Sequence, residues 1–421
     1  MERSPANRKV TTTLVSGEIE SVAPPRHPAG APGAAAGATG ASATIRAVSG
    51  RGRHRRGPAA IRLAAAAAAV AAVLSLGGGT GAGAAAASAP ASAPSSLVKA
   101  PPAPPPALDH VTFATNWKAE AEHGGFYQAL ATGIYRRHGL DVTLRMGGPQ
   151  LNNSQLLAAG QIDFNVGANS FAALNYARAG VPVVTVAAIF QKDPQVLLAH
   201  PGQGNDSFAA LKGKPIMVAP AARATFWNFL KIRFGYSDDQ IRTYTFSMAP
   251  FLADPKAIQE GYLTSEPFTL AKAGVKPVVL LMADHGFDSY STTLECSWHL
   301  AETRPDLVQR FVDATVEGWY SYLYSDPAPA NRSIKRDNPE MTDDLLAYAI
   351  AALKSRGVVD SGDALTGGIG AMTDVRWRSF AAAMIRAGLY PANLDLSRAY
   401  TLRFVNRRAG MQLKAAPAAH R

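Results

Sequence analysis

The chain has 421 residues, enough for two or three domains, with a formal net charge of +11 and one cysteine. Residues 1–100 hold 11 Lys and Arg against 3 Asp and Glu, which leaves 31 basic and 28 acidic residues in 101–421. The body of the chain is therefore nearly neutral, and its overall basic charge does not indicate nucleic acid binding. The single Cys296 excludes an internal disulfide, a thiolate metal cluster and a lipid-anchoring cysteine at the end of a signal.

The first hundred residues have the composition of an export region. Residues 1–50 are rich in Ala, Gly, Pro, Ser and Thr without a hydrophobic period, which predicts a disordered extension. Residues 51–93 combine a basic start, an apolar run of about 14 residues and an A-x-A pattern, typical of a secretory signal and short of the roughly 20 residues of a membrane span. Residues 94–107 read as a Pro-rich linker. We therefore expect an exported, periplasmic or extracytoplasmic protein.

From about Leu108, strands alternate with helices, which is typical of an α/β fold. After about Met341 the pattern changes to helices alone. The expected strands are His110–Asn116, Asp141–Met146, Phe164–Gly167, Val183–Phe190, Val196–His200, Ile216–Ala219, Tyr244–Phe246, Val278–Met282 and Ser291–Cys296. The expected helices are Gly125–His138, Asn152–Ala159, Asn169–Ala179, Ala222–Phe234, Asp254–Glu260, Glu266–Ala273, Arg304–Tyr324, Asp343–Arg356 and Asp374–Ala387.

The corner between the first strand and the first helix contains candidate binding residues. Trp117 lies at the carboxyl edge of the expected sheet, where open α/β sheets bind ligands, although a core position is an equal alternative. His123 and Gly124 precede the helix, where free N–H groups attract an acceptor atom, although His123 could simply cap the helix. Tyr127, within the helix, could reach the same cleft.

Two further segments of the same half carry polar candidates. Asn169 and Ser170 form another strand-to-helix corner, where either could bind a ligand or only cap the following helix. Gln191 follows the apolar strand Val183–Phe190 and is a candidate for ligand contact or for a solvated hinge. Its neighbour Lys192 is better explained as a surface charge.

The second half offers two candidate segments. At the corner Pro220–Trp227, Thr225 and Phe226 are candidate binding residues, and Arg223 either holds an anion or points to solvent. The segment Gln259–Phe268 reads QEGYLTSEPF and contains Glu266, whose carboxylate could accept N–H groups from a ligand or stabilise a helix start.

The segment His110–Asp163, together with Asp206–Val218, resembles solute-binding proteins of ABC importers. The branch concerned covers nitrate, sulfonates, taurine and thiamine precursors. The resemblance implies a type II periplasmic binding protein fold, with two lobes that each hold a mixed sheet flanked by helices, plus C-terminal helices. Lobe one would comprise 108–198 with 290–405 and lobe two 199–289, with a tail at 406–421. The chain crossings would lie near Val196–Pro201 and His285–Thr293.

The resemblance also implies a function. Trp117 and His123 have the Trp-x5-His spacing of thiamine-pyrimidine binders, and the Glu266 segment is similar to their Q-x-G-Y-x-T-x-E-P signature. An aminopyrimidine is therefore the expected ligand, delivered to an ABC permease by a monomer without cofactor, metal or catalytic residues. Nitrate, taurine or an alkanesulfonate is the alternative, although the Pro220–Trp227 corner lacks the Gly- and Ser-rich turn of the sulfonate branch. A thiamine-pyrimidine synthase is a remote alternative, because those enzymes carry a cysteine cluster and use iron.

Overall fold

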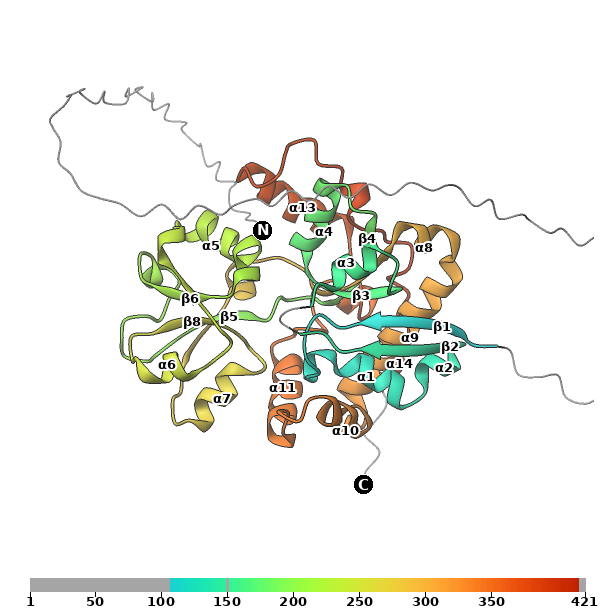
Figure 1. Cartoon of the computed structure of the whole chain (residues 1–421), viewed down its shortest axis with the longest axis horizontal. Helices are drawn as coiled ribbons and strands as arrows, with labels where there is room; N and C mark the ends of the chain where they lie inside the picture. Colours follow the sequence, from blue (N-terminus) through green and yellow to red (C-terminus); the bar gives the residue numbers. More distant parts are fainter. Residues whose placement is uncertain (1–106, 149–150, 416–421) are drawn as a thin grey trace, which may run out of the picture. The chain divides into compact units, whose positions relative to one another are not determined.

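Two five-stranded sheets organise the part of the chain that the computed structural model describes, residues 107–148 and 151–415 (Figure 1). The expected extension, signal region, nearly all of the linker and the end of the expected tail lie outside the described residues. Within the described ranges, no helix has the length and apolar character required to cross a membrane.

The first sheet has the strand order β2-β1-β3-β10-β4. β1 pairs in parallel with β2 and β3, whereas β10 runs antiparallel to β3 and β4, so the sheet is mixed. Every residue of β4 is buried, as the continuous apolar run VVTVAAIF predicts. The strands are β1 Asp109–Ala114, β2 Leu140–Arg145, β3 Phe164–Asn169, β4 Val183–Phe190 and β10 Ser291–Ser297.

The second sheet has the order β7-β6-β8-β5-β9 and is also mixed. β5 is antiparallel to β8 and β9, and β6 is parallel to β7 and β8. The expected α/β fold with two mixed sheets is therefore confirmed. The strands are β5 Gln195–Ala199, β6 Ile216–Val218, β7 Ile241–Thr243, β8 Ile258–Tyr262 and β9 Val278–Leu281.

Helices flank both sheets. The α-helices are α1 Gly124–Ala131, α2 Ile134–Arg137, α3 Asn153–Ala158, α4 Ser170–Ala179, α5 Phe226–Phe234, α6 Ala249–Ala253, α7 Glu266–Lys272, α8 Trp298–Thr303, α9 Pro305–Tyr324, α10 Ala328–Asp337, α11 Asp343–Ser355, α12 Ala364–Gly367, α13 Asp374–Arg386 and α14 Gln412–Ala415. Short 3-10 turns are η1 Ala121–His123, η2 Ala209–Leu211, η3 Pro220–Ala224, η4 Asp238–Gln240, η5 Met282–His285 and η6 Leu396–Arg398.

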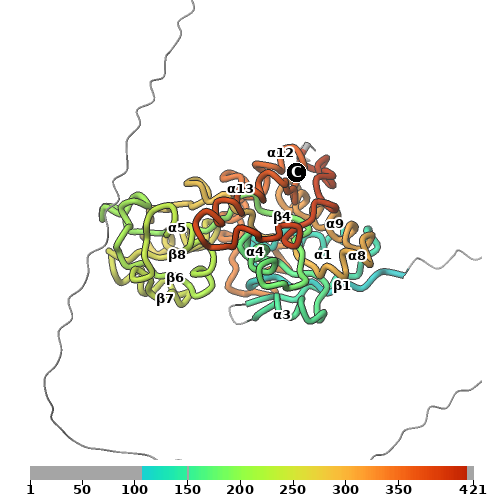
Figure 2. The backbone as a smooth tube through the Cα atoms, turned by 90° about the horizontal axis from the view of Figure 1, so that it is seen from above, coloured from blue at the N-terminus to red at the C-terminus, as the bar shows by residue number. Residues whose placement is uncertain are grey.

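The helices that matter for the site pack tightly on the first sheet. Phe311 of α9 stacks on Phe164 of β3 with ring centroids 3.8 Å apart. α1 approaches α9 closely, since a Cβ on Gly125 would lie 2.2 Å from the Trp319 ring. α13 lies beside α4 in both views, where Phe380 meets Phe171 at 5.1 Å (Figures 1 and 2). Through α9, the start of α1 is packed against the first sheet.

Two segments connect the lobes, and Arg376 of α13 binds both. We use lobe one for the part built on the first sheet and lobe two for the part built on the second sheet. The connections lie at 191–194 and 286–290. Arg376 Nη2 donates to the carbonyl oxygens of Gln191, at 2.5 Å, and of Ser289, at 3.4 Å. The expected first crossing at Val196–Pro201 falls several residues too late, because β5 already belongs to the second sheet.

Two predictions in lobe two are wrong. The expected helix Asp254–Glu260 is replaced by a turn at Asp254, whose carboxylate accepts from the Lys256 N–H, and by β8. The expected strand Tyr244–Phe246 lies just after β7. Phe246 cannot continue a strand because its φ is 62°, in the left-handed region. Both errors concern segments that reach the cavity described below.

Candidate functional site

A cavity of about 350 Å³ is lined by residues of both lobes. Lobe one contributes the segment after β1 and the end of β3, and lobe two contributes β5, the end of β6, β8 and the start of α7. This volume is within the range of small-molecule sites, about 300–1,000 Å³. The cavity therefore lies where a two-lobed α/β protein can enclose a small ligand.

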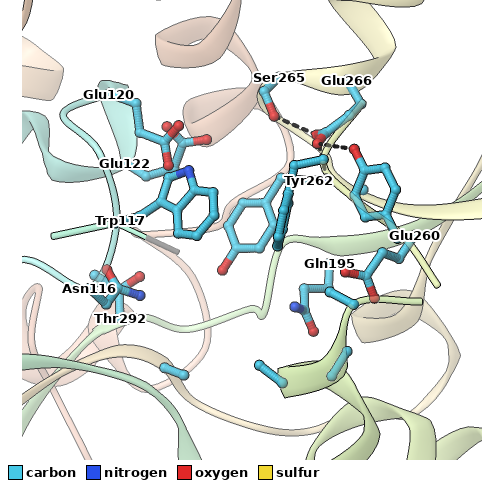
Figure 3. A pocket seen from close by; sticks show the side chains of 18 of the residues that line it. Asn116, Trp117, Glu120, Glu122, Gln195, Glu260, Tyr262, Ser265, Glu266 and Thr292 are labelled. Carbon is cyan, nitrogen blue, oxygen red and sulfur yellow. Dashed lines mark hydrogen bonds between the residues drawn. The ribbon is translucent and has the colours of Figure 1, made fainter. Parts of the chain in front are cut away.

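Aromatic rings from both lobes line this cavity. Trp117 of lobe one meets Phe246 of lobe two with ring centroids 4.9 Å apart, and Phe246 meets Tyr244 at 5.3 Å. Tyr262 also lines the cavity (Figure 3). Flat aromatic faces favour a planar ligand, which can stack on them, and a cationic one, which their electron-rich faces attract.

Four carboxylates line the same cavity: Glu120 and Glu122 from lobe one, Glu260 and Glu266 from lobe two (Figure 3). Among the described residues, no Lys or Arg lines it. Burial raises the pKa of Glu122 to about 7 and that of Glu260 to about 8. Burial, together with the neighbouring carboxylates of Glu122 and Glu266, raises the pKa of Glu120 well above its usual range. The cavity is built to accept hydrogen-bond donors or positive charge.

Several buried polar atoms at this cavity have no partner within the described part of the chain. They are Oε1 of Gln195, Oε2 of Glu260 and Nδ1 of His123. The other ring nitrogen of His123, Nε2, lies 3.0 Å from Asn116 Oδ1, and burial lowers the pKa of His123 to about 4, so the ring is neutral at pH 7. Because an unpaired buried polar group costs about 1–3 kcal/mol, these atoms favour a ligand that supplies their partners.

Glu266, by contrast, is already engaged. Its Oε2 accepts from the Tyr262 N–H at 2.8 Å and from the Ser265 hydroxyl at 2.5 Å, and its Oε1 accepts from the Tyr244 hydroxyl at 3.3 Å. It is also the first residue of α7, where a carboxylate complements the helix dipole. Glu266 thus fixes the aromatic side of the cavity in lobe two while still lining it.

Two residues with left-handed backbone line the cavity. Phe246 has φ 62° and Thr292, at the start of β10, has φ 47°. A β-branched residue in this region is strained by about 1–3 kcal/mol, and such strain concentrates at binding sites. Thr292 lies between Ser291 and Thr293, both of which pair with β3, so the strain is confined to the residue that faces the cavity.

The structure brings three of the sequence candidates to the cavity: Trp117, His123 and Glu266. Gly124 does not line it, because the Tyr322 ring occupies the space that a Cβ would take. The Tyr127 hydroxyl donates to Asp337 Oδ2 at 3.1 Å, away from the cavity.

The other candidates also lie apart from the cavity lining. Asn169 caps α4 and donates to Asp193 Oδ2, while Ser170 Oγ accepts from the Tyr290 N–H. Gln191 donates to the carbonyl oxygens of Ala188 and Ala371. Thr225 donates to the Ala222 carbonyl oxygen at 3.2 Å, and Phe226 is fully buried.

Sequence reasoning did not select most of the polar lining. Glu120 and Glu122 lie shortly before His123, inside the candidate segment that begins at Trp117. Two acidic residues close to Trp117 could have indicated that they also line the site. Glu260 lies in the candidate segment Gln259–Phe268, but the expected helix Asp254–Glu260 did not place it on a strand that lines the cavity. Arg223, the anion candidate, lines a separate depression with Lys231 and Asp238. Within the described residues, no three His, Cys, Asp or Glu side chains are placed to hold a metal ion.

The fold defines a two-lobed α/β protein of the periplasmic binding protein class, and the cavity between its lobes is the candidate ligand site. The model of the NMT1/THI5-like family matches residues 120–330, half of the chain, and the chain belongs to that family. The structure is similar to the aliphatic sulphonate binding protein SsuA of Escherichia coli, with a TM-score of 0.54 and 13% identity over 70% of this chain and 92% of that one.

Two curated relatives differ in how much of the chain they match. The riboflavin-binding protein RibY of Chloroflexus aurantiacus is 24% identical over 321 residues, which cover 74% of this chain and 91% of RibY. The 4-amino-5-hydroxymethyl-2-methylpyrimidine phosphate synthase of Schizosaccharomyces pombe is 28% identical over 110 residues, which are 26% of this chain and 32% of the synthase. The likeness to the synthase is therefore partial.

Proposed function

We propose that this chain is an extracytoplasmic substrate-binding protein that captures an aminopyrimidine of the thiamine-precursor type and delivers it to an ABC permease. The observation that carries the ligand class is the joint presence, in one cavity, of aromatic faces and four carboxylates without a lining Lys or Arg among the described residues. An aminopyrimidine is flat and bears N–H donors, so it can stack on Trp117 while it donates to carboxylate or amide oxygens.

The unpaired acceptors support the same class. Gln195 Oε1 and Glu260 Oε2 are buried acceptors that an exocyclic amino group can satisfy. His123 Nδ1 is a third buried atom without a partner in the described part of the chain, and the neutral ring can accept or donate a hydrogen bond there depending on its tautomer. The family to which the chain belongs and the partial likeness to a pyrimidine phosphate synthase agree with this ligand.

Anion binding is disfavoured by charge. A sulfonate or nitrate in this cavity would face Glu120, Glu122, Glu260 and Glu266 without a lining cation among the described residues. Arg223, which could bind an anion, lies in the separate depression beside Lys231. The raised pKa values of Glu120, Glu122 and Glu260 leave part of these groups protonated at pH 7. An anion would still lack a balancing cation, and each ionised carboxylate would repel it, since like charges in a poorly hydrated site repel strongly.

Riboflavin is a second candidate ligand. The specific observation that favours it is the likeness to RibY, which extends over 91% of that protein. A flavin also offers a flat ring and one ring N–H, although it requires more of the cavity than a single pyrimidine does. Both candidates keep the transport role and differ only in the ligand.

The test is calorimetric titration of the full chain with 4-amino-5-hydroxymethyl-2-methylpyrimidine, riboflavin and taurine. We expect the pyrimidine to bind, and Glu260→Gln to weaken its binding at least tenfold because the amide has one acceptor oxygen where the carboxylate has two. Arg223→Ala is the matched control and should leave the affinity unchanged. Tight binding of taurine that Arg223→Ala abolishes would refute the proposal, and binding of riboflavin alone would replace the pyrimidine.

A further inference from the structure

The carboxylates of the cavity come in two pairs on opposite lobes. Glu120 and Glu122 follow β1 in lobe one, and Glu260 and Glu266 belong to β8 and α7 in lobe two. Figure 3 shows the first pair beside Trp117 and the second pair on the other side of Tyr262. The pairs act on each other electrostatically, because Glu266 raises the pKa of both Glu120 and Glu122. Any approach of the lobes therefore brings negative charge toward negative charge.

The lobes are in contact around these pairs. The Thr264 hydroxyl of lobe two donates to Glu122 Oε1 of lobe one, and Trp117 meets Phe246 across the cavity. On the outside, Lys272 of α7 pairs with Asp344 of α11 at 2.8 Å, and the Tyr348 hydroxyl donates to the Leu263 carbonyl oxygen. The carboxylates thus lie inside a cleft whose walls already touch.

Other charged groups near the cavity do not neutralise the four acids. Lys118 lowers the pKa of Glu120 but its Nζ pairs with Glu340 at 2.9 Å. His123 is buried and uncharged at pH 7, since its pKa is lowered to about 4. Asp193, whose pKa is raised to about 6 by burial, adds further negative charge near Tyr262. Tyr244 and Tyr262 stay neutral because burial raises the pKa of each.

We propose that the cleft closes only when positive charge balances the two carboxylate pairs, so that the site selects a cationic ligand. This inference rests on the proposed function and names the charge class of its ligand. A cation between the pairs would offset the repulsion between their carboxylates. The aromatic faces of Trp117 and Tyr262 would attract the cation and orient the ligand. In the absence of ligand, protons perform the same neutralisation, so acid alone closes the cleft.

A ligand-free experiment tests the closure. The full chain carries Leu130→Cys on α1 and Leu252→Cys on α6, both exposed sites on different lobes, while the native Cys296 is buried and escapes labelling. Spin labels at the two sites report the distance between the lobes by electron paramagnetic resonance. We expect this distance to shorten as the pH falls from 8 to 5.

Variants define which groups are responsible. Glu122→Gln with Glu260→Gln should give the short distance already at pH 8, because two charges are removed while the new amide oxygen at position 122 can still accept from Thr264. Glu302→Gln, an exposed acid on α8, is the control and should behave as the parent chain. A distance that is independent of pH, or a double variant that matches the parent, would overturn the inference.

A ligand pair tests the charge class. The probes 4-amino-5-aminomethyl-2-methylpyrimidine and 4-amino-5-hydroxymethyl-2-methylpyrimidine have nearly the same size, but the first carries an ammonium group. At pH 7 we expect the aminomethyl probe to bind at least tenfold more tightly and to shorten the distance. Equal affinities would overturn the cation preference while the proposed function stands. If neither probe binds and acid still closes the cleft, the aminopyrimidine assignment fails and the charge-controlled closure stands.

Discussion

Two strand-to-helix corners of lobe one have the same local architecture and different surroundings. At the Asn169 corner, defined as Asn169 and Ser170, both residues are buried and the polar side-chain atoms are satisfied by the protein itself. At the Trp117 corner, defined as the segment 116–123, Trp117 remains partly exposed and His123 Nδ1 has no partner in the described part of the chain. The partners at the Asn169 corner come from the two connections between the lobes, through Asp193 and Ser289.

The difference indicates why one corner, and not the other, is a candidate binding site. The sheet edge provides the position at both corners, but only the corner that the rest of the chain leaves uncovered can offer its groups to a ligand. At the Asn169 corner the connections supply the hydrogen bonds that a ligand would supply. Unsatisfied buried groups, rather than location at the sheet edge, therefore distinguish the two.

The largest expected effect is on stability, and it distinguishes a tightly packed glycine, Gly124, from a glycine that lines the cavity, Gly148. In Gly124→Ala, the added Cβ would lie 2.0 Å from the Tyr322 ring, so we expect the free energy of unfolding to fall by about 3 kcal/mol. Gly148 lines the cavity with no described atom within 4 Å of a Cβ, so Gly148→Ala should change stability by less than about 0.5 kcal/mol. Urea denaturation without ligand measures both. Equal losses would show that these glycine contacts do not control stability.

The second effect is on ligand affinity at the Trp117 corner. Trp117→Ala removes a stacking face, so we expect the affinity for 4-amino-5-hydroxymethyl-2-methylpyrimidine to fall about 100-fold, or about 2.7 kcal/mol. Trp298, on α8 and outside the cavity lining, provides the control, and Trp298→Ala should leave affinity unchanged. Calorimetric titration measures both variants. An unchanged affinity in Trp117→Ala would show that Trp117 does not contact the ligand, so that the Trp117 corner, like the Asn169 corner, would have only a structural role.

The third effect is the pH dependence of stability that Glu260, on the lobe-two side of the cavity, produces. Burial raises the pKa of Glu260 to about 8 in the folded chain, above its usual value near 4.5. The folded state therefore binds this proton more tightly than the unfolded state, so its contribution to stability is full below about pH 4.5 and is lost as the pH rises through 8. We therefore expect the ligand-free chain to lose stability between pH 5 and 8 from this group, by at most about 1.4 kcal/mol for each pH unit.

The amide variant isolates that contribution. Glu260→Gln cannot ionise, so its free energy of unfolding should fall less over the same pH range. Glu302→Gln, an exposed acid, should retain the slope of the parent chain. Urea denaturation at pH 5, 6, 7 and 8 gives the slopes, and a parallel slope in Glu260→Gln and the parent would rule out Glu260 as the titrating group.

The sequence predicted the five strands of the first sheet, although it missed α8 and α10, and it failed at the centre of lobe two. β4 was predicted with its observed bounds, because a fully buried strand is a continuous apolar run. β8 reads IQEGY, and its polar residues Gln259 and Glu260 face interior and cavity, so it lacks both the apolar run and the alternation of ordinary strands. The residues that serve the site are the ones that remove the strand signal.

Some residues of the candidate site could likewise be predicted from the sequence, and others could not. Trp117, His123 and Glu266 could be selected because their sequence neighbours place them at corners. Tyr244, Phe246 and Glu260 could not, since the pairing of β6 with both β7 and β8 brings their segments to one cavity. The two lobe connections decide which corners stay uncovered. The connection residue that contacts Asn169, Asp193, is more than twenty residues away along the chain.

The smallest effect tests the Asn169 corner directly. Asn169→Ala removes the cap of α4 and the amide that donates to Asp193 Oδ2, so we expect a loss of about 1 kcal/mol in the free energy of unfolding. Asn169→Ser restores a capping oxygen but not the bond to Asp193, and should recover part of that loss. Because Asn169 does not line the cavity, both variants should bind the pyrimidine within about twofold of the parent chain. A large loss of affinity with stability intact would instead make the Asn169 corner a second ligand-binding corner, since only contact with the ligand separates affinity from stability in this way.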